Sequence, residues 1–540
     1  MMHTHLPQAP GQRLAREAAI RQIPVAQVYE EKDPTSNEST RRAQQQEEAT
    51  AVDALIQPSA LNHPAKHARI AIVGAGIAGL NAALRLQDAG LSCSIYEASD
   101  RIGGRMHSDT TTWADGMVSE WCGEFIDSDH ETILHLSARF GLKTIDLGQG
   151  TGGRAQSIMY FFNRYYSAEE LWGDFQAIYP ILQQQVKEAG FPTTHTHFTE
   201  TGYRLDHLSV YDWIEQYVKG GHDTPLGRML DGGCTGYYGL DTRTQSSLNL
   251  VYMFGSQASE DQVASAGPVR GSFKIVGGNQ QLPLAIAASL PQGCIQLNHR
   301  LVALKQNSNA SITLSFTTSN GPSEVTCDHV ILALPFSTLR HVDYQQAGFD
   351  ALKQTAITQL GYGTISKLFL QFDTRYWYQD GPWPRVSNGF IMTDLDIQVL
   401  WDTSLGQTGT SGLLVDYTSG PRGAAYAPPT AYSTTADSVK VQHYAQSCLQ
   451  QLERVFPGIS AHYTGTAALS YPTGDPYLLG SYACWRVGQY TLFGGYEGVR
   501  QGPVHFAGEH CSVTWQGFME GGASEGARAA QEILQDYGMV

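Results

Sequence analysis

The residues of this sequence that are best placed to do chemistry are three glycines and one acid. Gly74, Gly76 and Gly79 follow the apolar run 69–73, and Glu97 ends a second apolar run, 91–96. Glycines at this spacing make a tight turn, bring backbone amides close to a pyrophosphate and let a helix pack closely on a strand. An acid at the end of the next strand can accept hydrogen bonds from a ribose diol, and it repels a 2′-phosphate. The pattern predicts a dinucleotide site that disfavours NADP and leaves FAD and NAD open.

Lys367 is a second candidate because it is the one charge in an apolar segment. Residues 361–370 read GYGTISKLFL. A charge inside an apolar strand is costly in free energy unless it serves a purpose. The alternative interpretation is a lysine on an edge strand whose ammonium reaches solvent.

A third candidate region lies near the C-terminus, where an apolar run precedes a glycine-rich helix start. Residues 504–510 read VHFAGEH, and residues 517–530 read GFMEGGASEGARAA. Small residues permit close backbone approach, and the amides at a helix N-terminus stabilise negative charge on a bound cofactor. This segment is therefore expected to contact the cofactor.

Alternating strands and helices must position these segments. Apolar residues have helical spacing over 78–88 and 131–140, and 329–335 is a continuous apolar run, typical of a strand buried on both faces. Residues 297–304 and 312–317 alternate like strands of a small antiparallel layer. We expect an α/β fold with a doubly wound parallel sheet.

Two stretches interrupt this domain. Residues 150–265 are rich in aromatic side chains and helical periods. Residues 341–470 contain expected strands at 366–372 and 412–417 and an expected helix at 438–456, and should form the floor of a substrate cavity. The expected boundaries are a polar N-terminal extension at 1–66, a discontinuous cofactor domain at 67–126, 268–340 and 471–540, and a discontinuous substrate domain at 127–267 and 341–470.

The composition narrows the class of protein. The chain has 540 residues, of which 42% are hydrophobic and 16% charged, and its net charge is −16. Such a chain is globular, and its negative charge argues against binding to nucleic acid or anionic membranes while it suits a cationic substrate. No run approaches the roughly 20 apolar residues of a membrane span, and the N-terminus lacks a signal pattern, so a cytoplasmic protein is expected.

The cysteines and the N-terminal extension carry no recognisable chemistry. The eight cysteines are scattered without metal-ligand spacing, so we expect single thiols in a reducing compartment and no metal site. The extension is polar and interrupted by prolines, and residues 12–23 are compatible with one short helix.

A second glycine turn follows Glu97 directly and carries a family resemblance. Residues 101–105 read RIGGR, with arginines at both ends. Together with the C-terminal string FAGEH…WxGFMEGGxxEGxRAA, this turn resembles the motifs of the flavoprotein amine oxidases, which include monoamine, polyamine and L-amino-acid oxidases. The resemblance covers 67–540 and implies a Rossmann-type FAD-binding domain with a discontinuous α+β substrate domain. The FAD contacts that it implies are Gly74, Gly76, Gly79, Glu97, Gly104, Arg105, Val302, Gly508, Glu509 and Met519.

The resemblance also implies roles for four side chains. Lys367 matches the lysine that holds a water against flavin N5 and assists reoxidation by oxygen. Tyr482 and Phe518 match the aromatic positions that flank the substrate nitrogen, and Trp515 is expected to border the same cavity. Aromatic faces attract a partly cationic amine, by about 0.5–2 kcal/mol.

Ser481 decides how the flavin is expected to be held. It stands where monoamine oxidases have the cysteine that bonds covalently to the flavin. We therefore expect non-covalent FAD. Cys484 follows too late to take that place, and a small core thiol is its expected role.

The substrate is less closely defined. L-amino-acid oxidases with a GGMR-type turn clamp the substrate carboxylate with an arginine, whose bidentate geometry suits that group. Residues 123–126 read GEFI instead, so either another arginine binds a carboxylate or the substrate has none. Glu124 is then either a pocket residue that meets a cationic substrate or an acid that caps a turn.

We expect an oxidase that converts an amine, with water and molecular oxygen, to a carbonyl compound, ammonia and hydrogen peroxide. An L-amino acid is favoured narrowly over an aromatic amine or a polyamine. A flavin-dependent desaturase or isomerase and a non-catalytic flavoprotein scaffold are the alternatives from other classes. A homodimer is also compatible with the sequence.

Overall fold

The computed structural model describes residues 67–149, 156–255 and 272–540. The N-terminal extension, with the helix expected at 12–23, lies outside the described residues. Within them, no helix combines the length and the apolar character needed to cross a membrane.

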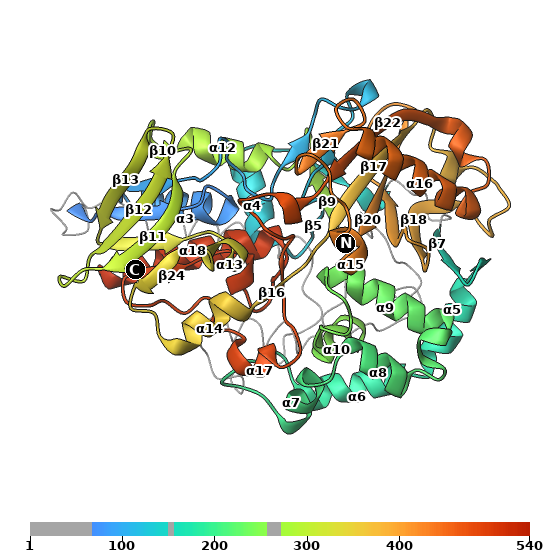
Figure 1. Cartoon of the computed structure of the whole chain (residues 1–540), viewed down its shortest axis with the longest axis horizontal. Helices are drawn as coiled ribbons and strands as arrows, with labels where there is room; N and C mark the ends of the chain where they lie inside the picture. Colours follow the sequence, from blue (N-terminus) through green and yellow to red (C-terminus); the bar gives the residue numbers. More distant parts are fainter. Residues whose placement is uncertain (1–66, 150–155, 256–271) are drawn as a thin grey trace, which may run out of the picture.

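A five-stranded parallel sheet organises one side of the molecule, on the left of Figure 1. Neighbouring strands pair in parallel throughout. The strands lie in the order β10 (Ile295–Gln296), β2 (Cys93–Tyr96), β1 (Ile70–Val73), β14 (His329–Leu332) and β24 (Val504–Phe506). The expected α/β fold with a parallel sheet is confirmed.

β14 is the strand that the continuous apolar run predicted. Val330, Ile331 and Leu332 are fully buried, because β1 and β24 pair with the strand on its two edges and helices cover its faces. The strand is shorter than the run, since Pro335 takes the N-cap position of α13 (Phe336–Leu339).

Helices α3 (Ile77–Asp88) and α18 (Met519–Asp536), which flank the parallel sheet, pack against each other. Helix α12 (Gln281–Ser289) packs against α3. A Cβ at Gly526 would lie 2.1 Å from the Ala78 carbonyl oxygen, so only glycine permits this approach. The Asn81 amide donates to the Ala523 carbonyl at 2.7 Å. The C-terminal glycines therefore bring α18 close to α3.

A four-stranded layer is formed by strands that lie on both sides of β14 in the chain. It has the order β13 (Gly321–Cys327), β12 (Ile312–Thr318), β11 (Arg300–Gln306) and β15 (Asp343–Gln346). The pair β11–β12 is antiparallel, as predicted; β13, which was not predicted, pairs with β12 in the same way, and β15 pairs with β11 in parallel.

An eight-stranded sheet with helices occupies the other side of Figure 1. The predicted strands are present as β17 (Ser366–Phe372) and β20 (Gly412–Thr418), and the predicted helix is α16 (Val439–Val455), capped by Ser438. The remaining strands are β21 (Tyr432–Thr434), β22 (Tyr463–Ser470), β19 (Val399–Asp402), β18 (Ser387–Thr393), β7 (Gln156–Phe161) and β8 (Arg164–Tyr165).

The aromatic-rich segment forms the helical group at the lower right of Figure 1. Its helices are α5 (Ala168–Gln176), α6 (Tyr179–Ala189), α7 (Glu200–Asp206), α8 (Val210–Tyr217), α9 (Pro225–Tyr238) and α10 (Ser247–Gly255). β9 (Ser272–Ile275) then pairs with both β5 (Ile126–Asp127) and β6 (Thr144–Asp146). The chain thus leaves the parallel sheet and returns to it twice, while the exact domain boundaries stay a prediction.

Candidate active site

The three glycines of the first turn have different surroundings. Gly74 has a φ of +107°, and a Cβ there would lie 2.7 Å from the Ala333 carbonyl oxygen. A Cβ at Gly79 would lie 2.0 Å from the Gly74 carbonyl oxygen. A Cβ at Gly76 would have no protein atom nearer than the Gly104 Cα, at 4.0 Å. The fold itself requires glycine at the first and third positions, and the second leaves open space.

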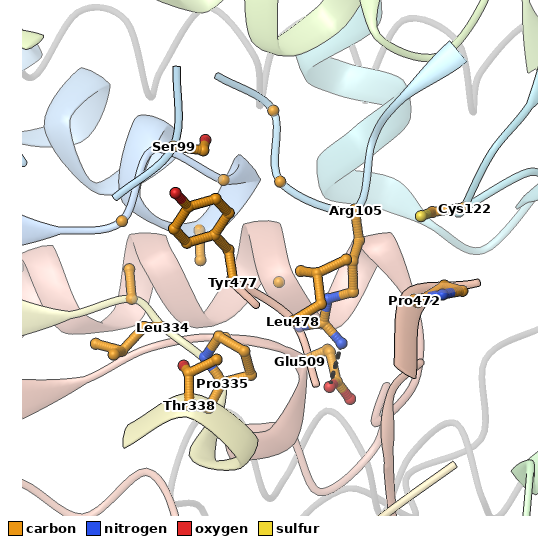
Figure 2. A pocket seen from close by; sticks show the side chains of 18 of the residues that line it. Ser99, Arg105, Cys122, Leu334, Pro335, Thr338, Pro472, Tyr477, Leu478 and Glu509 are labelled. Carbon is orange, nitrogen blue, oxygen red and sulfur yellow. Dashed lines mark hydrogen bonds and ion pairs between the residues drawn. The ribbon is translucent and has the colours of Figure 1, made fainter. Parts of the chain in front are cut away.

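The second glycine turn lies against the first. The Gly103 amide donates to the Ala75 carbonyl at 2.9 Å, and Gly104 has a φ of +55° that favours glycine. Both turns line one cavity of about 530 Å³, which Figure 2 shows from close by. The cavity lies at the carboxyl ends of β1 and β14, where α/β sheets bind ligands.

Nine of the ten expected cofactor residues line this cavity. They are Gly74, Gly76, Glu97, Gly104, Arg105, Val302, Gly508, Glu509 and Met519. Gly79 stands apart because it packs α3 against its strand, as the contact with Gly74 shows. Residues spread over more than 400 positions of the sequence thus meet at one site.

The Glu97 carboxylate is held in place at the edge of the cavity by three hydrogen bonds. Its Oε2 accepts from the Ala75 amide at 2.7 Å, and its Oε1 accepts from the amide and hydroxyl of Ser99 at 2.9 and 2.8 Å. A carboxylate has about four lone-pair sites, so acceptor capacity remains for a diol.

Arg105 and Glu509 join the second glycine turn to the C-terminal motif. Their Nη1 and Oε1 atoms lie 2.8 Å apart, as the dashed line in Figure 2 marks. Glu509 also accepts from the amides of Ala483 and Gly517, at 3.1 and 2.7 Å, and Arg105 donates to the Ser481 carbonyl at 3.0 Å. Both side chains line the cavity while they hold its walls together.

Two buried polar side chains of the cavity wall lack a protein partner. Ser481 Oγ and both ring nitrogens of His510 make no hydrogen bond within the described residues. Burial holds the pKa of His510 well below its ordinary range, so the ring is neutral. Together with the open face of Gly76, these atoms fit a polar ligand of the size and chemistry of FAD.

Lys367 lies in the cavity wall and its ammonium is fully engaged. Nζ donates to the carbonyls of Glu120 and Cys122, at 3.0 and 2.8 Å, and to Glu124 Oε2 at 2.9 Å. The edge-strand alternative is wrong, because β17 pairs with β20 on one side and β22 on the other. An ammonium has three protons, so a water could bind one only by replacing a protein acceptor.

Glu124 lies behind the wall and does not line the cavity. Its Oε1 accepts from Lys274 Nζ at 2.6 Å, Thr403 Oγ1 at 2.6 Å and Trp401 Nε1 at 3.1 Å. Burial alone would raise the pKa of Glu124, but the two lysines hold it well below its usual range. The expectation that Glu124 meets a cationic substrate is corrected here, because lysines of the protein itself occupy both oxygens.

The predicted aromatic pair lines the cavity. The Tyr482 hydroxyl hydrogen-bonds with the Tyr417 hydroxyl, 3.0 Å away, and donates to the Tyr237 carbonyl. Phe518 is the N-cap residue of α18. Trp515 was expected to border the same cavity, but it lines neither this cavity nor the smaller one described next. Its ring centroid lies 5.7 Å from that of Phe518, so Trp515 packs behind Phe518.

A smaller cavity of about 100 Å³ adjoins the first at Tyr482, Gly517 and Phe518, which line both. Its described lining has no charged side chain. The other lining residues are Phe191, Tyr237, Tyr238, Tyr252, Ala483, Trp485, Tyr490, Val513, Thr514 and Gln516.

The family model of the flavin-containing amine oxidoreductases matches residues 77–534. The chain belongs to this family. The resemblance seen in the sequence is thereby confirmed, and membership implies a flavin cofactor and an amine substrate.

Relatives of this amine oxidoreductase include named L-amino-acid oxidases. The chain is 26% identical over 501 residues to YobN of Bacillus subtilis strain 168, whose name assigns it provisionally to those enzymes. That match covers 88% of this chain and 96% of YobN. The chain is 25% identical over 490 residues to the L-amino-acid oxidase of Mus musculus, covering 88% and 72% of the two chains.

Solved structures of amine oxidases share the fold of this amine oxidoreductase. A putrescine oxidase with bound putrescine has a TM-score of 0.70 at 22% identity. The cyclohexylamine oxidase of Brevibacterium oxydans IH-35A has a TM-score of 0.73 at 20% identity. Each match covers 87% of this chain and 99% of the other.

Sequence reasoning missed several residues of this amine oxidoreductase site. Lys274 had a detectable signal, because it is a lone lysine in the apolar run of β9, as Lys367 is in β17. Trp401, Thr403 and Tyr417 had none, since their role depends on how distant strands are arranged.

Proposed function

We propose that this protein is an FAD-dependent oxidase of primary amines that carry an apolar or aromatic group. The observation that carries this proposal is the smaller cavity, whose described lining is aromatic and uncharged. A carboxylate is bound best by arginine, and a second ammonium needs an acid, because either charge is costly to bury alone. An amine with a neutral tail fits this lining better than an amino acid or a diamine.

Bound FAD would supply the redox chemistry, accepting two electrons and two hydrogens overall from the CH–NH unit of the amine, which leaves an imine, and passing them to oxygen as hydrogen peroxide. Water then converts the released imine to a carbonyl compound and ammonia. Glu97, Arg105 and the two glycine turns would hold the cofactor without a covalent bond. Ser481 offers a hydroxyl at the linking position, which forms no thioether.

The protein's own contribution to the reaction is orientation and desolvation. Tyr482 and Phe518 line both cavities, so they stand where a substrate would pass from one to the other. Aromatic faces there favour a partly cationic nitrogen, by about 0.5–2 kcal/mol, and exclude bulk water. The Tyr417 and Tyr237 contacts fix the orientation of the Tyr482 ring.

An L-amino acid is the second candidate substrate. The relatives named above that align with 88% of this chain are L-amino-acid oxidases by name. An aromatic L-amino acid would place its ring in the same uncharged cavity, and its carboxylate would then depend on neutral donors.

Matched substrate pairs that differ only in the carboxylate test this choice. We would measure peroxide formation with tryptamine and L-tryptophan, phenethylamine and L-phenylalanine, and tyramine and L-tyrosine, with putrescine as the diamine. The decarboxylated partner is expected to have at least a tenfold higher kcat/KM in each pair. Higher kcat/KM values for the amino acids would favour the L-amino acid as the substrate instead. Anaerobic bleaching of the flavin would show whether any of these compounds reduces the cofactor.

A further inference from the structure

Two histidines and one aspartate meet on the parallel sheet away from the cavity. His329 begins β14, whereas the opposite end of that strand leads into the cavity wall at Leu334. His505 lies on the neighbouring strand β24, and Asp536 is the last residue of α18. One ligand-type atom from each of the three lies within 4.8 Å of the others.

Two ring nitrogens of the cluster lie at a distance that suits a hydrogen bond and equally two ligands of one metal ion. His329 Nδ1 lies 3.2 Å from His505 Nε2. Zinc binds imidazole nitrogen at about 2.0–2.1 Å in tetrahedral geometry, which separates two ligand nitrogens by about 3.3 Å. Asp536 Oδ2 lies 4.0 Å from His329 Nδ1, so this partly exposed carboxylate would have to move toward the rings to become a ligand.

The Glu532 carboxylate favours the tautomer of His505 that a metal site needs. His505 is fully buried, and its Nδ1 lies 2.7 Å from Glu532 Oε2. With its proton on that nitrogen, His505 presents the lone pair of Nε2 toward His329. A carboxylate that orients a metal-binding histidine in this way is the usual outer partner of a zinc site.

Two arginines pair with the acids around the cluster. Arg500 Nη1 donates to both oxygens of Asp536, at 2.8 and 2.7 Å, and Arg528 pairs with Glu532. A carboxylate has about four lone-pair sites, so Asp536 keeps acceptor capacity while Arg500 positions it. The Tyr537 ring packs against His329 with centroids 5.5 Å apart.

We propose that His329, His505 and Asp536 bind a divalent transition-metal ion, with Zn²⁺ as the fitting species and water in the fourth position. The ion would bind His329 Nδ1 in place of the hydrogen bond between the rings, with the His329 proton on Nε2. It would connect two strands of the cofactor sheet to the end of α18, whose first turn lines the cavity. Cysteine and histidine spacing gave no sign of it, because the ligands come from segments far apart in the sequence.

Zinc content of the intact flavoprotein tests the proposal. The holoprotein would be stripped with EDTA, equilibrated with low micromolar ZnCl₂, desalted and measured by atomic emission. We expect the wild type to retain about one more zinc ion per chain than His329→Ala or Asp536→Asn. Each of these two variants should bind zinc at least tenfold more weakly than the wild type. His462→Ala is the matched control, because His462 also pairs with an aspartate, Asp373, outside the cluster.

Three further readouts make the result decisive. Zn²⁺ should raise the Tm of the wild type and of His462→Ala but not of the two ligand variants. Co²⁺ should give the visible absorption of a four-coordinate centre in the wild type. Glu532→Gln should weaken zinc binding about 10–100-fold, as loss of an outer partner does. Equal zinc content and equal Tm shifts in all variants would overturn the proposal, and Asp536→Asn decides alone if His329→Ala fails to fold.

Discussion

The Lys367 ammonium lies 2.9 Å from Glu124 Oε2, and both groups are almost completely buried. Lys274 lies 2.6 Å from the other oxygen of the same carboxylate. Burial raises the pKa of neighbouring Glu120 to about 8, so at neutral pH it does not add a second full negative charge. Two cations share one anion, and the excess positive charge lies next to the cavity wall.

Glu124→Gln should destabilise the protein rather than change its substrate preference. The variant leaves Lys274 and Lys367 buried without their counter-ion, which costs about 3–5 kcal/mol. Urea unfolding of the holoprotein measures this loss. Glu170→Gln is the control, because its pair with Arg164 is half exposed and should contribute less than about 1 kcal/mol. Equal stability of the two variants would contradict the inferred role.

The same carboxylate predicts a loss of stability in acid. The pKa of Glu124 is lower in the folded protein than in the unfolded chain, so its contribution is complete above the ordinary carboxyl pKa, near 4.5. The contribution decreases as the pH falls below that value toward the folded pKa. The stability difference between wild type and Glu124→Gln should therefore be fully present at pH 5–6, below the titration of Glu120, and shrink below about pH 4.5.

Lys367→Met should slow reoxidation of the reduced flavin by oxygen more than its anaerobic reduction by substrate. The cation at the cavity wall would stabilise negative charge that develops on oxygen, and its loss should cost about tenfold or more in that step. Stopped-flow traces separate the two half-reactions.

Lys274→Met is the matched control for that variant. Lys274 binds the same carboxylate but does not line the cavity, so it should share the loss of stability and keep the oxygen rate much closer to the wild type. Equal slowing of both half-reactions in Lys367→Met would indicate a structural role for that lysine.

Gly76→Val and Gly79→Ala should fail in different ways. The side chain at position 76 enters the open space of the cavity, so the apoprotein should fold and lose FAD retention. The methyl group at position 79 meets the Gly74 carbonyl at 2.0 Å, so the apoprotein itself should be destabilised. Thermal melts of the apoproteins and flavin absorbance after desalting distinguish the two. A Gly76→Val protein with stoichiometric FAD would show that the turn does not meet the cofactor.

Acid precipitation should release the flavin into the supernatant, because Ser481 cannot form the thioether that a cysteine would. Absorbance at flavin wavelengths in supernatant and pellet gives the result. Colour that stays with the pellet would require a covalent bond to another side chain.

Local patterns predicted the elements closely. The apolar strand predicted at 366–372 has the same bounds as β17, and the glycine spacing identified the turn between β1 and α3. These features depend on side-chain periodicity and on backbone geometry that only glycine adopts, and both are visible in neighbouring residues.

The surroundings of Glu124 could not be predicted in the same way. Its partners lie on β9, β17 and β19, so the sequence shows an acid and two lysines without showing that they meet. Whether Glu124 faces a substrate or a lysine depends on how the sheet that contains β9 and the sheet that contains β17 and β19 lie against the segment that carries Glu124. The pairing of distant strands decides this, and no local pattern encodes it.

The position of β24 at the edge of the parallel sheet has a consequence for biosynthesis. A ribosome makes β1, α3 and β2 first, but β14 gains its second neighbour, β24, only when residues 504–506 have emerged. α18, which covers α3 and begins at the cavity, comes later still. Until then the nascent chain exposes apolar strands and helix faces that attract chaperones or other chains. We therefore expect cofactor loading only after β24 and α18 have been synthesised.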